Sequence, residues 1–235
     1  MNLQVTLAAR YLVGRRLRTV LTTLAIVFGA LVIFGMNTIL PTMLRAFQSN
    51  LLAASGQVDI TITQKTGEAF SANIMNRIRA TPGIRVMVGS LSRTVNIPDG
   101  YYGRAKLGAL TLTGIDPNDA PMLRNYPVES GRFLRSSDTN AAVISASLAE
   151  SLGLALGDKL TLPTTEGEVP LKIVGLLPAR ALPGNEEVLV TLYSAQKWLD
   201  LPDRINTVEI NLDTTDLAQR QAIQQSIEAA LGEDY

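Results

Sequence analysis

The side chains that most often carry out chemistry in proteins are scarce in this sequence. Its 235 residues include no histidine and no cysteine. Histidine is the commonest metal ligand and general base, so its absence removes the usual serine triad and most zinc sites. The phosphate-binding pattern GxxxxGK[ST] and the dinucleotide pattern GxGxxG are also absent. We therefore predict that the chain is not an enzyme and has no catalytic residue, metal site or cofactor.

Two pairs of carboxylates remain as candidate ligands. Asp116 and Asp119 lie in the segment GIDPND and offer oxygen atoms to calcium, but their spacing does not match an EF-hand loop. Turn capping is the favoured interpretation, because aspartate readily accepts bonds from nearby backbone N–H groups. Glu186 and Glu187 follow a Pro-Gly pair and are expected in a solvated loop. Arg132, in the segment SGRF, is expected to make a structural hydrogen bond.

Charge is unevenly distributed along the chain, although the formal net charge is zero. The first 45 residues contain five arginines and no acidic residue, whereas the rest of the chain contains 16 basic and 21 acidic residues. An acidic body argues against nucleic acid as a partner. The basic start needs a separate explanation.

That explanation comes from an apolar segment, since residues 19–44 are 26 residues without a charge. A helix needs about 20 mostly apolar residues to cross a bilayer. We predict one transmembrane helix with a periplasmic extension over residues 19–52. The positive-inside rule then places residues 1–18 in the cytoplasm and the body outside. The arginines that set this orientation, at the cytoplasmic surface of the lipid bilayer, are Arg10, Arg15, Arg16 and Arg18.

Other interpretations of this region stay open. A cleaved signal peptide has an apolar region of only about 7–15 residues, although Ala53-Ala54-Ser55 resembles a weak cleavage site. A buried core helix is less favoured than a membrane span, because this long segment is apolar all round. The arginines either set topology alone or belong to a short amphipathic helix on the inner membrane surface.

The body, residues 53–235, alternates between predicted strands and helices. Apolar alternation predicts strands over residues 58–62, 84–97, 107–115, 141–144, 159–162, 169–177, 187–192 and 207–212. Helices are predicted over residues 70–78, from Ser145 or Ser147 to Gly153, over residues 194–198, and from Asp216 onward. Residues 117–140 are expected to be mostly loop, and Tyr193 and Trp198 to anchor a short helix in the core. Helices packed on mixed strands indicate an α+β fold.

Six segments occur in an order that resembles one known family, the MacB-like (FtsX-like) ABC transporter permeases. The first is similar to the first transmembrane helix of that family, and the others to its periplasmic core domain. They are RRLRTVLTTLAIVFGALVIFG, RIRATPGIRVMVGSLSR, LTLTGIDPNDAPMLRNYPVESGRFL, AAVISASLAESLGLALGDKLTL, LKIVGLLP and EVLVTLYSAQKWL. The resemblance covers nearly the whole chain.

The resemblance implies a permease with four transmembrane helices, whose extracytoplasmic domain lies between the first and the second. It implies a homodimer or heterodimer of permeases and a separate ABC ATPase, whose ATP hydrolysis moves the extracytoplasmic domain for export or mechanotransmission. The site would be the cytoplasmic (inner) membrane, with the body periplasmic or extracellular and with a periplasmic adaptor or substrate protein as a further partner. A two-lobed domain with an inserted lobe around residues 100–185 is expected. The three return helices are missing from the sequence, so we expect an N-terminal fragment of the permease subunit.

A second hypothesis is a single-pass, membrane-anchored periplasmic binding domain with no ATPase partner. An exported enzyme is a weaker one, because no catalytic constellation is visible. Under the first two hypotheses, partner contacts are expected on exposed loop tips, which carry binding more often than core strands do. The candidates are Tyr101 and Tyr102 in one tip, and Glu186 and Glu187 in another.

Overall fold

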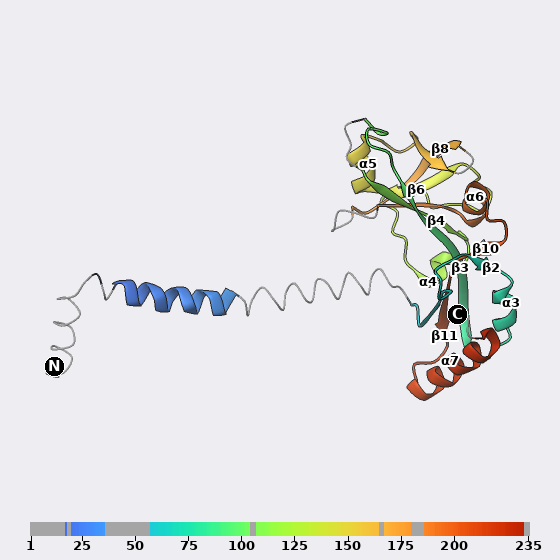
Figure 1. The fold of residues 1–235 in the computed structure, drawn as a ribbon, viewed down its shortest axis with the longest axis horizontal. Coiled ribbons are helices and arrows are strands. Elements are labelled where there is room, and N and C mark those ends of the chain that lie inside the picture. Colours follow the sequence, from blue (N-terminus) through green and yellow to red (C-terminus); the bar gives the residue numbers. More distant parts are fainter. Residues whose placement is uncertain are drawn as a thin grey trace. The chain divides into compact units, whose positions relative to one another are not determined.

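The computed structural model divides the chain into two compact units, Met1–Ala54 and Ser55–Tyr235. In the first unit, residues 20–35 are helical (Figure 1). Each of their large apolar side chains is exposed. Among the residues that the structure describes, no helix combines the length and the apolar character needed to cross a membrane. These described residues are 17, 20–35, 57–103, 107–164, 167–179 and 186–232. The four arginines predicted at the cytoplasmic surface lie outside them.

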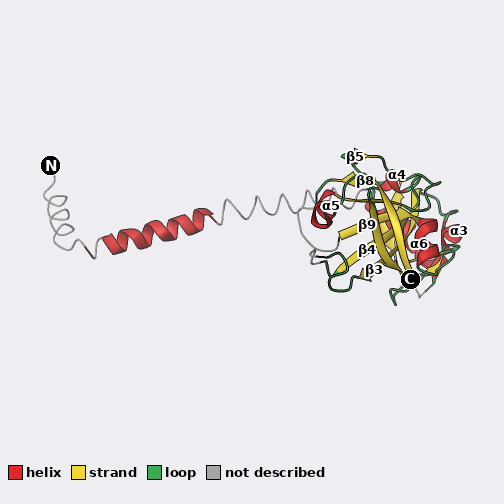
Figure 2. Ribbon diagram, turned by 90° about the horizontal axis from the view of Figure 1, so that it is seen from above, coloured by secondary structure: helices red, strands yellow, loops and turns green. Residues whose placement is uncertain are grey.

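The second unit is built on a mixed sheet, in which the described strands follow the order β1-β11-β3-β4-β9-β6-β8-β5, with β7 paired to β8 (Figures 1 and 2). Neighbours β4 and β9, and β6 and β8, are parallel, and the other pairs are antiparallel. The strands are β1 (Ile60–Ile62), β3 (Ile84–Asn96), β4 (Ala109–Ile115), β5 (Ser130–Gly131), β6 (Ala141–Ser145), β7 (Lys159–Thr164), β8 (Gly167–Leu177), β9 (Glu186–Thr191) and β11 (Thr207–Leu212).

Strand β3 joins the two halves of this sheet. Its first half pairs with β11 from Ile84 to Ser90, and its second half pairs with β4 from Ser90 to Asn96. Both halves therefore belong to one hydrogen-bonded sheet. A separate two-stranded sheet pairs β2 (Phe70–Ser71) with β10 (Arg204–Ile205).

Short helices cover the sheet: α3 (Ile74–Ile78), α4 (Ala120–Leu123), α5 (Ala146–Leu152), α6 (Leu192–Trp198) and α7 (Leu217–Leu231). Their ends follow local capping rules. The Ser145 side chain accepts a bond from the Leu148 N–H, and Gly153 ends α5 in the left-handed region. The Asp216 side chain accepts from the Gln219 N–H at the start of α7. Of the two predicted caps Ser145 and Ser147, Ser145 is the one observed; the predicted end at Gly153 is confirmed, and α7 begins directly after Asp216.

Three apolar clusters fill the unit. One packs α3 and α7 against β1 and β11, with Ile78, Ile205, Val208 and Ile210 fully buried at its centre. The second lies under α5 and α6 and includes Trp198, while the third lies beside α4. Most strands bury apolar residues in these clusters, whereas both residues of β5 are exposed and all five residues of β6 are buried.

Asp59 ties the start of the sheet to its other elements. Its carboxylate accepts from the Leu212 N–H at 2.8 Å and from the Asn211 amide at 2.9 Å, and it pairs with Arg220 of α7. The Asp59 side chain is only 13% exposed. The segment that enters the second unit is thus fixed at once to β11 and to α7.

Several predicted elements need correction. Phe70 lies in β2 and α3 begins only at Ile74, although Phe70, Ile74 and Ile78 share one core cluster as the helical spacing suggested. Helix α6 is capped by Thr191 and starts before Ser194. Residues 117–140 contain α4 and β5 as well as loop.

The mixed α/β character is confirmed, whereas the inserted lobe around residues 100–185 stays a prediction. Trp198 is buried as expected, but Tyr193 is 67% exposed, so its prediction as a core anchor was wrong. Tyr193 follows the first residue of α6, where its ring lies on the solvent side of the short helix.

Candidate functional site

Glu186 and Glu187 open strand β9, so the prediction that both lie in a solvated loop was wrong. Glu186 is 7% exposed and accepts hydroxyl bonds from Ser145 at 2.6 Å and from Ser147 at 3.3 Å. Glu187 is half-buried and accepts from the Thr113 hydroxyl at 2.7 Å. Alternation along β9 sends the two carboxylates to opposite faces of the sheet. Neither carboxylate is at an exposed tip, so contact with a partner stays a prediction.

Tyr101 and Tyr102 follow the Pro-Asp-Gly turn that ends β3, and both are half-buried. Their rings meet edge to face, with centroids 4.9 Å apart, and both pack against the core under α5 and α6. The Tyr102 hydroxyl donates to the Thr161 carbonyl at 2.5 Å. Burial raises the pKa of Tyr102, and it also raises the pKa of Tyr101, to which the Glu168 carboxylate adds. These tyrosines therefore fasten the β3–β4 turn to β7, and their contact with a partner remains a prediction.

Asp116 behaves as the turn interpretation predicts. Its carboxylate accepts from the Asn118 N–H at 2.8 Å, whereas Asp119 occupies the cap position of α4 without a capping bond from its side chain. Among the described residues, no group of three or more acidic side chains could hold a metal ion.

A polar cluster lies on the sheet face that α4 partly covers. Arg124, at the end of α4, pairs with Glu209 of β11, and its Nε donates at 3.0 Å. Beside this pair, Thr113 links Ser92 to Glu187 through bonds of 3.3 and 2.7 Å. The cavity between these groups measures about 190 Å³. Burial raises the pKa of nearby Tyr126 to about 12. The charged groups satisfy one another, so this cluster serves to hold α4 on the sheet.

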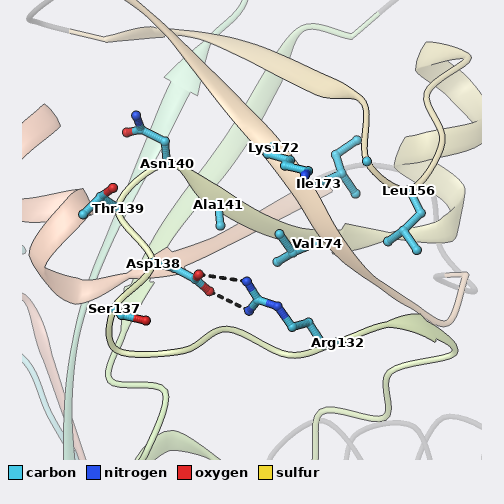
Figure 3. Close-up of a pocket in the computed structure, with 11 residues that line it drawn as sticks. Arg132, Ser137, Asp138, Thr139, Asn140, Ala141, Leu156, Lys172, Ile173 and Val174 are labelled. Atoms are coloured by element: carbon cyan, nitrogen blue, oxygen red, sulfur yellow. Dashed lines mark hydrogen bonds and ion pairs between the residues drawn. The ribbon is translucent and has the colours of Figure 1, made fainter.

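A larger cleft of about 570 Å³ lies between β6, β8 and the loop that follows β5 (Figure 3). Gly131 and Gly175 bring that loop against β8: an added Cβ would lie 2.3 Å from the Val174 oxygen and 2.2 Å from the Arg132 oxygen. Only glycine allows so close an approach of two backbones. Arg132 is thereby placed at the edge of the cleft.

The two terminal guanidinium nitrogens of Arg132 donate to the Asp138 carboxylate at 2.7 and 2.8 Å (Figure 3). Arg132 also donates to the Phe133 carbonyl at 2.9 Å. The structural hydrogen bond predicted for Arg132 is confirmed. Bonding to Arg132 holds the pKa of the Asp138 carboxyl below its usual range. This ion pair fixes the loop that forms one wall of the cleft.

The mixed sheet and its helices agree with comparisons to known proteins. A model of the family "MacB-like periplasmic core domain" matches residues 19–230. The chain belongs to this family. We therefore interpret the clefts and the two tyrosines as features of a MacB-like domain.

Curated and solved relatives of this MacB-like chain are distant. The uncharacterized ABC transporter permease protein Rv0987 of Mycobacterium tuberculosis is 28% identical over 145 residues, which are 57% of this chain and 16% of that protein. The chain therefore spans about a sixth of the length of this relative.

Two solved structures share the fold. The periplasmic region of MacB from Actinobacillus actinomycetemcomitans matches with a TM-score of 0.55 and 13% identity, over 79% of this chain and 89% of that one. The extracellular domain of the noncanonic ABC-type transporter YknZ from Gram-positive bacteria matches with a TM-score of 0.51 and 16% identity, over 72% and 94%.

Sequence reasoning missed the cleft, whose lining comes from three separate stretches of the chain. Leu156, Lys172 and Val174 lie in segments that resemble the family, but nothing in those segments indicates that the three side chains share a cleft. One signal was available: the short turn between the predicted strands 159–162 and 169–177 indicates a hairpin, which would pair Lys159 with Lys172.

Proposed function

We propose that this chain is part of a permease subunit of a MacB/FtsX-type ABC transporter, with residues 55–235 as its extracytoplasmic domain. The family match over residues 19–230 carries this proposal. In this function, a separate ATPase supplies the energy and the domain supplies movement outside the membrane. In this proposal, ATP hydrolysis takes place in the ATPase and this chain catalyses no reaction.

We further propose that residues 19–52 form the first transmembrane helix, with residues 1–18 in the cytoplasm. The 26 uncharged residues from Thr19 to Leu44 support it, as do the four preceding arginines. The helical part that is described, residues 20–35, exposes apolar side chains all round, which is how a helix meets lipid.

Movement of this helix would reach the domain through Asp59. The Asp59 carboxylate fastens the start of the domain to β11 and to α7, and β3 continues the same sheet as far as β4. The strands of this sheet are coupled by backbone hydrogen bonds. A displacement that enters the domain at β1 would therefore be passed on through β11 and β3 to β4.

A test is to express the complete reading frame with an affinity tag, in its natural host, and to identify copurifying subunits. We expect an ABC ATPase and a second permease. Spin labels at Thr94→Cys, an exposed position on β3, should then report a distance between the two domains that changes on ATP binding. An ATPase variant that cannot bind ATP is the matched control.

Purification without any ATPase, and a label distance that ATP leaves unchanged, would contradict this function. Those two results would favour the alternative, a membrane-anchored binding domain that works without an ATPase. Asp59→Ala separates coupling from assembly, since it should retain the ATPase and reduce the ATP-dependent change in distance.

A further inference from the structure

The cleft beside Arg132 offers more binding capacity than a structural ion pair needs. One part of its lining is apolar: Leu156, which is 45% exposed, and the half-buried Val174 present open apolar surface, whereas Ala141 and Ile173 lie buried behind it (Figure 3). Ligand sites are lined mainly by apolar side chains with a few polar groups, and Leu156 and Val174 supply the apolar part here. The volume of about 570 Å³ is in the range of pockets for small molecules.

Positive charge accompanies this apolar part of the cleft. Lys172 of β8 lines the cleft and lies directly opposite Lys159 of β7 in the antiparallel pair. Opposite residues share a face of the sheet, with Cβ atoms about 5 Å apart, and like charges there destabilise the pair. An anion between the two ammonium groups would relieve that repulsion.

The nearby carboxylates Asp138 and Asp158 make no ion pair with these lysines. The Asp138 carboxylate already accepts hydrogen bonds from the two terminal nitrogens of Arg132 and from the Arg135 N–H. The Asp158 carboxylate accepts a hydrogen bond from the Ala155 N–H at 2.8 Å. Within the described part of the chain, neither Lys159 nor Lys172 makes an ion pair or a side-chain hydrogen bond. Ser137, Thr139 and Asn140 also line this cleft.

The walls are also held in place before any ligand arrives. The Thr191 and Ser194 hydroxyls donate to the carbonyls of Asp138 and Thr139, at 3.1 and 2.8 Å, and the Lys172 N–H donates to the Asn140 carbonyl at 2.9 Å. A preformed cleft loses little entropy on binding.

We propose that this cleft binds a small organic phosphate, with the phosphate on Lys172 and Lys159 and the apolar body on Leu156 and Val174. A phosphate monoester matches two ammonium groups in charge, and an apolar body covers the apolar surface that a bare ion would leave in water. The site does not depend on the transport role, so its failure would leave the proposed function intact.

The test uses the full chain in detergent micelles and phenyl phosphate, which stays in the aqueous phase. Calorimetry should show saturable binding, and phenyl phosphate should protect Lys172 from acetylation while Lys197, exposed on α6, reacts unchanged. Lys172→Met should weaken binding about tenfold or more, the loss expected for a charge-assisted contact. Lys197→Met, the matched control, should bind like the original chain.

Leu156→Ser tests the apolar part of the cleft. It should weaken the binding of phenyl phosphate but leave the binding of inorganic phosphate unchanged. Lys172 and Leu156 are both at exposed positions, and circular dichroism checks that the Lys172→Met and Leu156→Ser variants are folded. Equal affinities for phenyl phosphate and inorganic phosphate would overturn the proposal. Benzyl alcohol that binds as tightly as phenyl phosphate would also overturn it. Full acetylation of Lys172 at saturating phenyl phosphate would overturn it too.

Discussion

At the scale of single residues, polar side chains in this domain hold elements together. Asp59, Glu186 and Arg132 each bond to segments outside their own element. A buried carboxylate is stable only when donors surround it, and these donors come from distant parts of the chain. Two of these contacts lead to measurable expectations.

Asp59→Ala should lower the free energy of unfolding by about 2–3 kcal/mol, because hydrogen bonds to charged groups contribute about 1.5–3 kcal/mol. The substitution leaves Arg220 without its partner and exposes the Leu212 N–H at the end of β11. Urea denaturation followed by circular dichroism gives the value. Asp213→Ala, at a nearby exposed position, is the control, and an equal loss in both variants would contradict the role of Asp59.

Asp138 should make stability depend on pH. Arg132 lowers the pKa of the folded Asp138 carboxyl, whereas the unfolded carboxyl titrates near 3.8. The pair therefore stabilises the fold above that pH, and the contribution is lost as the pH falls through the folded pKa. The stability difference between the original chain and Asp138→Asn should be largest near neutral pH and shrink under acid conditions.

Urea unfolding of both proteins over a pH series measures this difference. Arg132→Gln is the matched variant, since in its background Asp138→Asn should show much less of this pH dependence. A difference that stays constant down to about pH 2.5 would show that the ion pair contributes nothing to acid sensitivity.

At the scale of elements, glycines decide where backbones can meet. Gly114 of β4 lies beneath α6: an added Cβ would be 2.4 Å from the Ala195 Cβ and 3.2 Å from the Leu192 Cα. Helix α6 can therefore approach β4 only because this position has no side chain.

Gly114→Ala should destabilise the domain by about 1–3 kcal/mol, the usual cost of overpacking a core. Gly108→Ala, just before the same strand, has nothing within 4 Å of its added Cβ and should cost far less. Thermal unfolding of the two variants side by side is the measurement. Similar melting temperatures would mean that α6 moves away from β4 at little cost.

At the scale of the whole molecule, the proposed cytoplasmic start and extracytoplasmic body can be tested by cysteine labelling. The sequence has no cysteine, so single cysteines introduced by mutation are labelled without background. A membrane-impermeant maleimide should label Thr61→Cys, at an exposed position of β1, from outside intact cells.

Thr6→Cys, in the basic start, should be labelled only after the cells are broken. Labelling of both positions in intact cells would contradict a cytoplasmic N-terminus. Labelling of neither would contradict an extracytoplasmic body.

The sequence by itself determined the features that arise locally. Alternation predicted most strands, and the caps Ser145, Gly153 and Asp216 marked helix ends, because each depends on residues within one turn. The order of segments identified the family, which the match over residues 19–230 confirmed.

Tertiary structure decided what depends on distant partners. Phe70 had helical spacing yet pairs as a strand with Ile205, and Glu186 followed loop residues yet is buried beside Ser145. The cleft brings Arg132, Leu156 and Lys172 together from three segments. The order of the strands, and the close backbone contacts that the glycines permit, bring these residues together. Neither can be deduced from any single stretch of sequence.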